Sequence, residues 1–197
     1  MKMLMVILLS AMPVFAANNK AVKDVPDQFV IYAETASTRF IPSGYMGDFS
    51  DIRINQRWNQ NPGSGKNCIQ VTYSAERKQN AGWAGVYWQH PTNNWGDKKG
   101  GYNLTGYQTL TFMARGEKGG EYVDKFMIGG ITGLTEEGDS GDTSSDAVEL
   151  TKEWKSYSID LKDVDLAHII GGFGFVMNAD TNSAGAVFYL DEIRLLK

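Results

Sequence analysis

Short runs of alternating apolar and polar residues, separated by clusters of Gly, Asn, Asp and Ser, occupy most of the chain. Side chains along a strand point alternately to opposite faces, so such runs are typical of strands with one buried face. The pattern predicts an all-β fold, a two-sheet antiparallel β-sandwich of about nine strands. Apart from an aromatic strand described below, the expected strands are 29–34, 51–58, 67–74, 109–115, 123–131, 154–161, 172–178 and 187–195.

Two segments between these strands are expected to have other conformations. Residues 40–52 are rich in Gly, Ser and Pro, which predicts a long ordered loop that carries Tyr45, Asp48 and Asp51. Residues 163–170 are expected to form one helical turn.

The N-terminal residues have the pattern of a cleavable signal peptide. Lys2 gives a basic start, residues 3–9 are apolar, and small residues precede a cut after Ala16. The apolar stretch is too short to span a bilayer. We therefore expect a secreted or periplasmic protein without membrane insertion, in which residues 1–16 are removed, 17–28 form a flexible lead-in and 29–197 form one domain.

Charge and cysteine content narrow the class of ligand and the means of stabilisation. The formal net charge is −4 and the basic residues form no stripe, which disfavours nucleic acid and favours a neutral ligand. Cys68 is the only cysteine, so no disulfide can form within the chain. We expect Cys68 to be a small buried strand residue, with the fold held by its core or by a metal.

The segment 82–97, GWAGVYWQHPTNNWGD, contains three of the five tryptophans. In a strand, Trp83, Tyr87 and Gln89 lie on one face and Trp88 lies on the other. Flat aromatic rings beside an amide can stack on the apolar face of a sugar while the amide hydrogen-bonds its hydroxyls. The alternative interpretation is that both faces of the strand are buried in the sandwich.

Two features leave an enzyme as an alternative. Residues 138–142 read GDSGD, which is similar to the nucleophile loop of trypsin-like proteases except that Asp142 replaces the second glycine. A nucleophilic serine needs a histidine base held by a third group, and neither His90 nor His168 stands in a protease context. The many carboxylates leave open a polysaccharide lyase or hydrolase on the same sandwich.

Two acidic residues near the chain ends are candidates for a metal site. Glu34 ends the first expected strand and Asp191 lies in the last. If these strands are neighbours, the two carboxylates and the backbone carbonyls of the 64–66 turn provide the oxygen ligands that Ca²⁺ prefers. The alternative is that both are ordinary strand-end acids.

Eight ordered segments of the chain resemble the jelly-roll, galactose-binding-like carbohydrate-binding modules of secreted bacterial proteins, and are similar in style to family 11 modules. They are FIPSGYMGD, NPGSGKNCIQVTYS, GWAGVYWQ, GYQTLTFMARGEKGGE, FMIGGI, LTKEWKSYSIDL, IIGGFGF and FYLDEIRL. The resemblance implies a sandwich whose concave sheet binds a glycan without cleaving it. It also implies a structural Ca²⁺ at Glu34 and Asp191, with Lys66 contributing its carbonyl.

The resemblance and the strand alternation together suggest the binding residues. Many relatives carry an aromatic residue where this chain has Met113, so one stacking platform differs. Arg115 is interpreted as a donor to hydroxyls, with an internal ion pair to Asp124 or Glu121 as the alternative. The complete set of ligand-binding candidates is Trp83, Tyr87, Gln89, Trp95, Arg115, Asp139, Ser140 and Asn178.

The function favoured by the sequence is an exported, noncatalytic carbohydrate-binding module for a neutral, β-glucan-like polysaccharide or oligosaccharide. The alternatives are the lyase or hydrolase above and an envelope assembly domain whose aromatic face meets protein. Binding modules usually accompany a catalytic domain, which raises their effective concentration. The sequence leaves three alternatives open: a free-standing sugar binder, a module that associates with a separate envelope or catalytic protein, and a fold that has lost carbohydrate binding.

Overall fold

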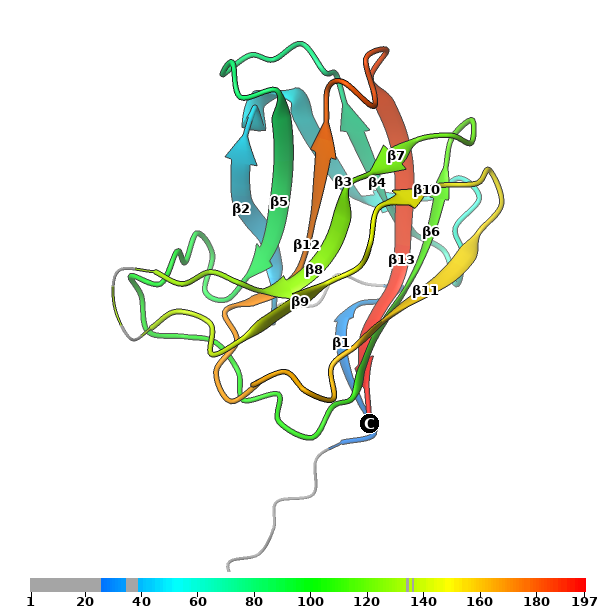
Figure 1. Ribbon diagram of the computed structural model, residues 1–197. Helices are drawn as coiled ribbons and strands as arrows, with labels where there is room; N and C mark the ends of the chain where they lie inside the picture. Colours follow the sequence, from blue (N-terminus) through cyan, green and yellow to red (C-terminus); the bar gives the residue numbers. More distant parts are fainter. Residues whose placement is uncertain (1–25, 35–38, 134, 136) are drawn as a thin grey trace, which may run out of the picture.

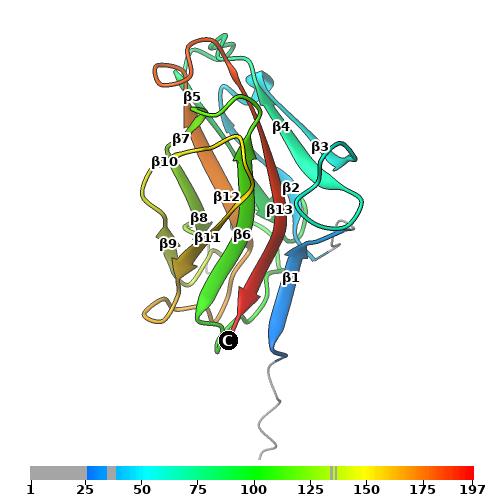
Figure 2. The same ribbon diagram turned by 90° about the vertical axis from the view of Figure 1, so that its right-hand side faces the viewer.

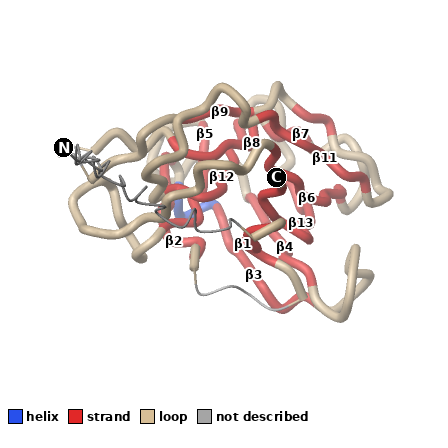
Figure 3. Tube along the Cα trace, turned by 90° about the horizontal axis from the view of Figure 1, so that it is seen from below, coloured by secondary structure: helices blue, strands red, loops and turns tan. Residues whose placement is uncertain are grey.

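In the computed structural model, residues 26–34, 39–133, 135 and 137–197 are described. They form two antiparallel β-sheets packed face to face (Figures 1 and 2). Sheet A has the strand order β11-β6-β13-β4-β3, with β1 paired to the C-terminal end of β13. Sheet B has the order β2-β5-β12-β8-β9. Seen from below, β5, β12, β8 and β9 lie in one layer and β4, β13 and β6 in the other (Figure 3).

The strands differ widely in length. Sheet A consists of β1 (Gln28–Tyr32), β3 (Ile52–Trp58), β4 (Cys68–Tyr73), β6 (Thr109–Gly116), β11 (Lys155–Asp160) and β13 (Ala186–Leu196). Sheet B consists of β2 (Ile41–Gly47), β5 (Trp83–Gln89), β8 (Lys125–Gly129), β9 (Asp142–Ser144) and β12 (Gly171–Asn178). A short 3₁₀ turn, η1 (Phe49–Asp51), follows β2, and β7 (Tyr122–Val123) pairs with β10 (Val148–Glu149).

The core lies between the two sheets and is rich in aromatic side chains. Trp88 is fully buried, with its ring edge-on to Phe173 at a centroid distance of 5.3 Å. Phe112 and Phe126 meet across the core at 4.5 Å. Cys68 is buried, as expected, and carries no disulfide. Interior aromatic packing of this kind supplies much of the stability of a sandwich.

The strand predictions are confirmed, with ends shifted by a few residues. The expected strand 123–131 is divided between the end of β7 and β8. The first and last strands are neighbours, because β1 pairs with β13.

Two predictions of irregular structure are wrong. Residues 40–52 contain β2 and η1 rather than one long loop. Pro42 is tolerated because β2 is an edge strand, and Gly44 makes room for Gln89, whose Cδ would lie 2.6 Å from a Cβ there. The segment 163–170 forms turns instead of a helical turn, because its backbone pairs with another segment: Tyr102 and Ile169 exchange N–H···O bonds of 2.9 Å.

Two predictions concern residues outside the part of the chain that the structure describes. The proposed signal peptide, 1–16, lies wholly outside it, as does most of the lead-in, 17–28. Within the described residues, no helix is long and apolar enough to cross a membrane.

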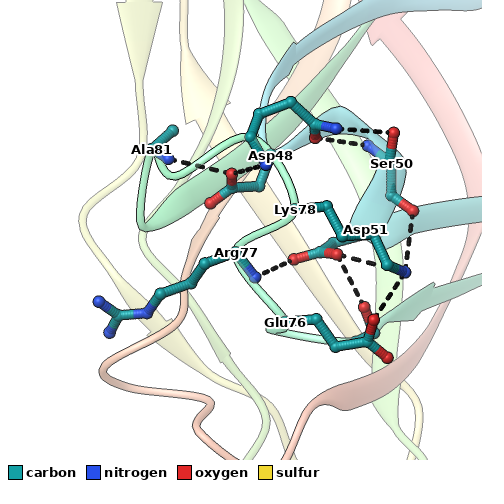
Figure 4. Close-up of polar contacts among 9 residues, drawn as sticks. Asp48, Ser50, Asp51, Glu76, Arg77, Lys78 and Ala81 are labelled. Atoms are coloured by element: carbon teal, nitrogen blue, oxygen red, sulfur yellow. Dashed lines mark hydrogen bonds and ion pairs between the residues drawn. The ribbon is translucent and has the colours of Figure 1, made fainter.

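Two buried carboxylates fix the loop between β4 and β5 (Figure 4). Asp48 accepts the backbone N–H groups of Gln79, Ala81 and Gly82 at 2.7–3.0 Å. Although burial opposes ionisation, these three donors hold the pKa of Asp48 below its ordinary value. The backbone N–H of Asp48 also donates to the carbonyl of Trp83 at 2.7 Å. Asp48 therefore anchors the start of β5, where the exposed Trp83 lies.

Asp51 holds the same loop from the other side. Its carboxylate accepts the Ser74 hydroxyl at 2.9 Å and the Arg77 backbone N–H at 2.7 Å, and the Lys78 ammonium lies 3.5 Å away. Both acids that the sequence places in the 40–52 segment are therefore structural.

Candidate functional site

The outer face of sheet B carries the aromatic strand as predicted. Ala84, Val86 and Trp88 of β5 point into the core, and the alternate residues point outward. Outward-facing Gly85 lies between Met46 of β2 and Val176 of β12 in the strand register. A small apolar cluster covers the middle of this face: Tyr87, Met127, Ile131 and Ile170, with Met46 and Val176 packed against it.

Two indole rings on this face are open to solvent. Trp83 at the start of β5 is 38% exposed and Trp95, in the loop after β5, is 39% exposed. Tyr87 lies in the cluster and is only 7% exposed, with its ring perpendicular to that of Trp95 at 6.4 Å. Its hydroxyl donates to the Gly129 carbonyl at 2.9 Å, and burial raises its pKa. Tyr87 therefore supports Trp95 and offers little surface of its own.

Glycines on β12 and β5 keep this face flat. A Cβ on Gly174 would lie 2.9 Å from the ring of Tyr87, and a Cβ on Gly85 would lie 3.0 Å from the Met46 methyl. Glycine at these two positions leaves room for the side chains of Tyr87 and Met46 to pack flat against the sheet.

The loop after β5, residues 91–100, is built around the buried side chain of Asn94. Its amide donates to the carbonyls of His90 and Lys98, and its Oδ1 accepts the N–H groups of Gly96 and Lys98, at 2.9–3.2 Å. These hydrogen bonds of the Asn94 side chain fix the backbone on both sides of Trp95, which lies between Asn94 and Gly96. The sequence carries no signal for this role of Asn94, because an Asn in a polar loop is typical of a turn.

Gln89 is fully buried and does not reach the open face. Its Nε2 donates to the Asn94 carbonyl at 2.8 Å, and its Oε1 accepts the Ser43 hydroxyl at 3.0 Å. Gln89 was predicted to bind a ligand, but the structure assigns both ends of its amide to anchoring the 91–100 loop on β2.

Asp139 and Ser140 also serve the loops beside the face. The Asp139 carboxylate accepts the backbone N–H groups of Ile131, Ile170 and Gly171 at 2.6–3.1 Å. Burial outweighs these three donors and raises its pKa. The Ser140 hydroxyl donates to the Asp165 carbonyl and accepts the backbone N–H of His168.

Asn178 is the polar candidate that the structure leaves beside an exposed ring. It is partly exposed and lies opposite Trp83 in the register of β12 with β5. Its Oδ1 accepts the Asp180 N–H at 2.8 Å. Three further polar residues, not among the predicted ligand-binding residues, face outward on the β8–β9 side of sheet B: Lys125, Asp142 and Ser144. Lys125 lies on the same face of β8 as the outward-facing Met127, and Asp142 and Ser144 pair with residues of that face in the register of β9 with β8.

Arg115 requires a correction, because β6 belongs to sheet A. Its guanidinium lies over the ring of Tyr189 at 3.9 Å and near that of Trp154 at 5.5 Å. The Glu117 carboxylate is 3.7 Å away, so neither acid proposed as its ion-pair partner fills that role. Arg115 packs on the sheet opposite the exposed tryptophans, and cation–π contacts of this kind are structural.

The metal candidates border a single turn on sheet A. Asp191 is fully buried, and its Oδ2 accepts the Ser64 N–H at 2.9 Å. A Cβ on Gly65, which has φ +59°, would lie 2.9 Å from the Glu34 carboxyl carbon. Burial raises the pKa of Asp191. Lys66 follows in the same turn, and no group of three His, Cys, Asp or Glu side chains suited to a metal occurs among the described residues. Any ion here would depend on backbone carbonyls.

A separate hollow of about 410 Å³ lies away from the exposed tryptophans. Asp51, Lys78, Glu117 and Glu121 contribute charges of both signs to its wall. Its mixed charge and distance from the aromatic face distinguish it from the flat site on sheet B.

Comparison with known proteins identifies relatives by family and by fold. The family model described as carbohydrate binding domain 30 matches residues 30–197. Among curated protein sequences, none matches the chain.

Several solved structures share the fold at low sequence identity. A family 30 carbohydrate-binding module of a cellulosomal cellulase of Clostridium thermocellum is 14% identical, with a TM-score of 0.58 over 86% of this chain and 97% of that one. A family 11 module of a cellulosomal cellulase of the same organism is 14% identical, with a TM-score of 0.53 over 86% and 94%. An agarase is 12% identical, with a TM-score of 0.54 over 87% of this chain and 24% of its own.

Proposed function

Because the chain belongs to the family of carbohydrate binding domain 30, we propose that it binds a neutral, β-linked glucan chain across the outer face of sheet B. The family to which the chain belongs is one of carbohydrate-binding domains. We propose the identity of the ligand, a β-linked glucan, and the face of the protein that binds it. Trp83 and Trp95 would stack on sugar rings, and Asn178 would hydrogen-bond hydroxyls at the Trp83 end.

One observation carries this proposal: two tryptophans, each more than one-third exposed, lie on the outer side of sheet B, one at the start of β5 and one in the loop after it. Between them lies a flat apolar strip formed by Tyr87, Met46 and Val176 over glycine backbone. A β-linked glucan is a flat ribbon with apolar faces and polar edges, and large rigid aromatic surfaces are suited to such faces. A flat face suits an extended chain better than an enclosed small molecule.

We propose that the outer face of sheet B binds the glucan without cleaving it. Ser140 donates its hydroxyl proton to the Asp165 carbonyl, and both ring nitrogens of His168 face carbonyl oxygens. The imidazole is therefore turned away from the role of a base for Ser140.

Export is part of the proposal and is supported by the sequence of residues 1–16. An exported module would act on extracellular or periplasmic polysaccharide, either free or beside a separate catalytic or envelope protein that raises its local concentration.

The test is a screen of the purified protein against cellohexaose, mixed-linkage β-glucan, xylohexaose and mannohexaose, combined with a reducing-sugar assay. We expect binding of the β-glucans with Kd of roughly 10 μM to 1 mM, typical of shallow sites, and no release of sugar. Release of product would support the lyase or hydrolase alternative. Failure to bind any glycan would contradict the proposal and favour a protein partner for the aromatic face.

We further propose that Asp191, Glu34 and the Lys66 carbonyl hold a structural Ca²⁺. The buried Asp191 carboxylate and the close approach of Glu34 to the same turn support this, because hard cations prefer clustered oxygen ligands. Such an ion would join the segment after β1 to β13 and the 59–67 loop, which no disulfide can do in this chain.

Chelation tests the calcium proposal. An ion present at a hundred times its Kd stabilises by about 2.7 kcal/mol, so EDTA should lower Tm by about 5–10 °C. Added Ca²⁺ should restore Tm, and Asp191→Asn should remove the response. Glucan affinity should stay unchanged in EDTA because the site lies on sheet A. An equal Tm with and without EDTA, in protein that retains no metal by elemental analysis, would overturn the proposal.

A further inference from the structure

The two loops beside Trp95 are held together at Gly96 and at a histidine, and the Thr135 hydroxyl of the second loop also donates to the Gly96 carbonyl of the first. The first loop is 91–100; the second, 130–141, follows β8, and the structure describes all of it except residues 134 and 136. Figure 1 shows them side by side at the lower left, in green and yellow-green. Gly96, next to Trp95, packs on Gly133, since a Cβ on Gly96 would lie 2.5 Å from the Gly133 Cα. The second contact is made by a histidine.

His168 bridges the loops with both nitrogens of its ring. Nδ1 lies 2.7 Å from the Gly138 carbonyl oxygen of the second loop, and Nε2 lies 2.9 Å from the Gly100 carbonyl oxygen of the first. A carbonyl oxygen can only accept a hydrogen bond, and a neutral imidazole carries one N–H. Both contacts can be hydrogen bonds only when the ring is protonated.

The surroundings hold the ring in this position. The His168 backbone N–H donates to Ser140, and a Cβ on Gly101 would lie 2.8 Å from Nε2. Neither acceptor glycine has room for a side chain: a Cβ on Gly138 would lie 2.3 Å from the Thr132 carbonyl oxygen, and one on Gly100 would lie 2.2 Å from Pro91. Both acceptor carbonyls therefore belong to closely packed backbone.

The charged groups around the ring favour its protonated form. Hydrogen bonding to Gly138 and Gly100, together with the nearby Glu137 and Asp139 carboxylates, outweighs burial and raises the pKa of His168. On the first loop, the Lys98 ammonium is engaged by the carbonyls of Thr92 and Asn93.

The other histidine behaves oppositely. His90 accepts the Gly101 N–H through its Nδ1, and burial lowers its pKa. The pKa values of the two histidines that flank Gly101 are therefore shifted in opposite directions.

We propose that His168 is a positioning residue for the glucan site: its imidazolium clasps the 91–100 loop to the 130–141 loop and thereby holds Trp95 in its binding position. The folded pKa lies above the ordinary value of 6.5. The clasp is complete below about pH 6.5 and loses one hydrogen bond as pH rises through the raised pKa. Glucan affinity then falls as the solution becomes alkaline. This inference rests on the proposed function of Trp95.

The test combines NMR without glycan and binding with it. The chain has two histidines, so His90→Gln leaves one imidazole signal, that of His168. We expect it to titrate above its ordinary pKa, and the Trp95 indole N–H resonance, assigned through Trp95→Phe, to move with the same midpoint. His168→Gln replaces the imidazole by an amide that does not titrate, so the movement of the Trp95 signal should disappear.

Calorimetry with cellohexaose gives the second measurement. We expect affinity at pH 5.5 to exceed that at pH 8.5 by about tenfold, the effect of one charge-assisted hydrogen bond on the competent population. The His90→Gln variant should keep this ratio and His168→Gln should abolish it.

The possible outcomes separate the two proposals. If the Trp95 indole resonance of the unaltered protein does not shift as His168 titrates, the clasp is overturned, even if the variants fail to fold. If cellohexaose binds at neither pH, the glucan proposal fails, and the clasp is judged by the Trp95 resonance alone.

Discussion

Replacement of both Trp83 and Trp95 by alanine is expected to abolish measurable binding of cellohexaose. Each tryptophan is more than one-third exposed on the outer side of sheet B, and a central aromatic contact typically contributes about 2 kcal/mol or more to binding. Each single substitution should therefore weaken binding by about 30-fold, and the pair by about 1,000-fold. Isothermal titration calorimetry or affinity electrophoresis would measure the change.

Two variants serve as controls for this experiment. Arg115→Ala removes a large side chain from sheet A, so it should leave cellohexaose affinity unchanged while lowering Tm through loss of the contact with Tyr189. Tyr87→Phe removes only the hydroxyl that donates to Gly129 and should weaken binding less than either tryptophan substitution. Unchanged binding in the double tryptophan variant would place the glycan on another surface.

Replacement of Asp139 by alanine is expected to have the largest effect on stability. The substitution leaves three backbone N–H groups, those of Ile131, Ile170 and Gly171, without their acceptor. We expect a loss of about 3 kcal/mol in the free energy of unfolding, or about 6–12 °C in Tm. The Tm of Asp139→Asn should lie between those of the unaltered protein and Asp139→Ala, because the amide oxygen of Asn can still accept a hydrogen bond. Calorimetric unfolding would measure both.

Asp142 provides the matched control for Asp139. It is an exposed carboxylate three residues further along the chain, so Asp142→Ala should change stability by no more than about 0.5 kcal/mol. If Asp139→Ala unfolds at the same temperature as Asp142→Ala, then Asp139 is free to contact sugar, as the sequence suggested, and our structural assignment is wrong.

The comparison of Gln89 with Trp83 shows the limit of strand alternation. Both were predicted on the outward face of one strand, and both are there. Alternation determines only the side of a sheet to which a residue points. The 91–100 loop folds back over one end of β5 and buries Gln89, whereas the other end, with Trp83, stays open. Coverage of a face by a loop distant from the strand's own pattern cannot be seen in that pattern.

Arg115 and Asp139 illustrate two further limits. The alternation along 109–115 is the same whichever sheet the strand joins, and long-range pairing of β6 with β13 and β11 decides that it is sheet A. Asp139 is a polar residue in a glycine-rich loop, a pattern equally typical of a ligand and of a backbone anchor. Its three donors come from two segments, one of them about thirty residues further along the chain.

The β-sandwich, the strand that carries the aromatic residues, and the two faces of that strand are predictable from the sequence, because period-two patterning is a local property of the chain. The sheet to which each strand belongs, the outward residues that stay open, and the position of His168 between two carbonyls depend on the folded protein. These depend on long-range pairing and loop packing, in which residues far apart in sequence compete for the same hydrogen bonds and the same space.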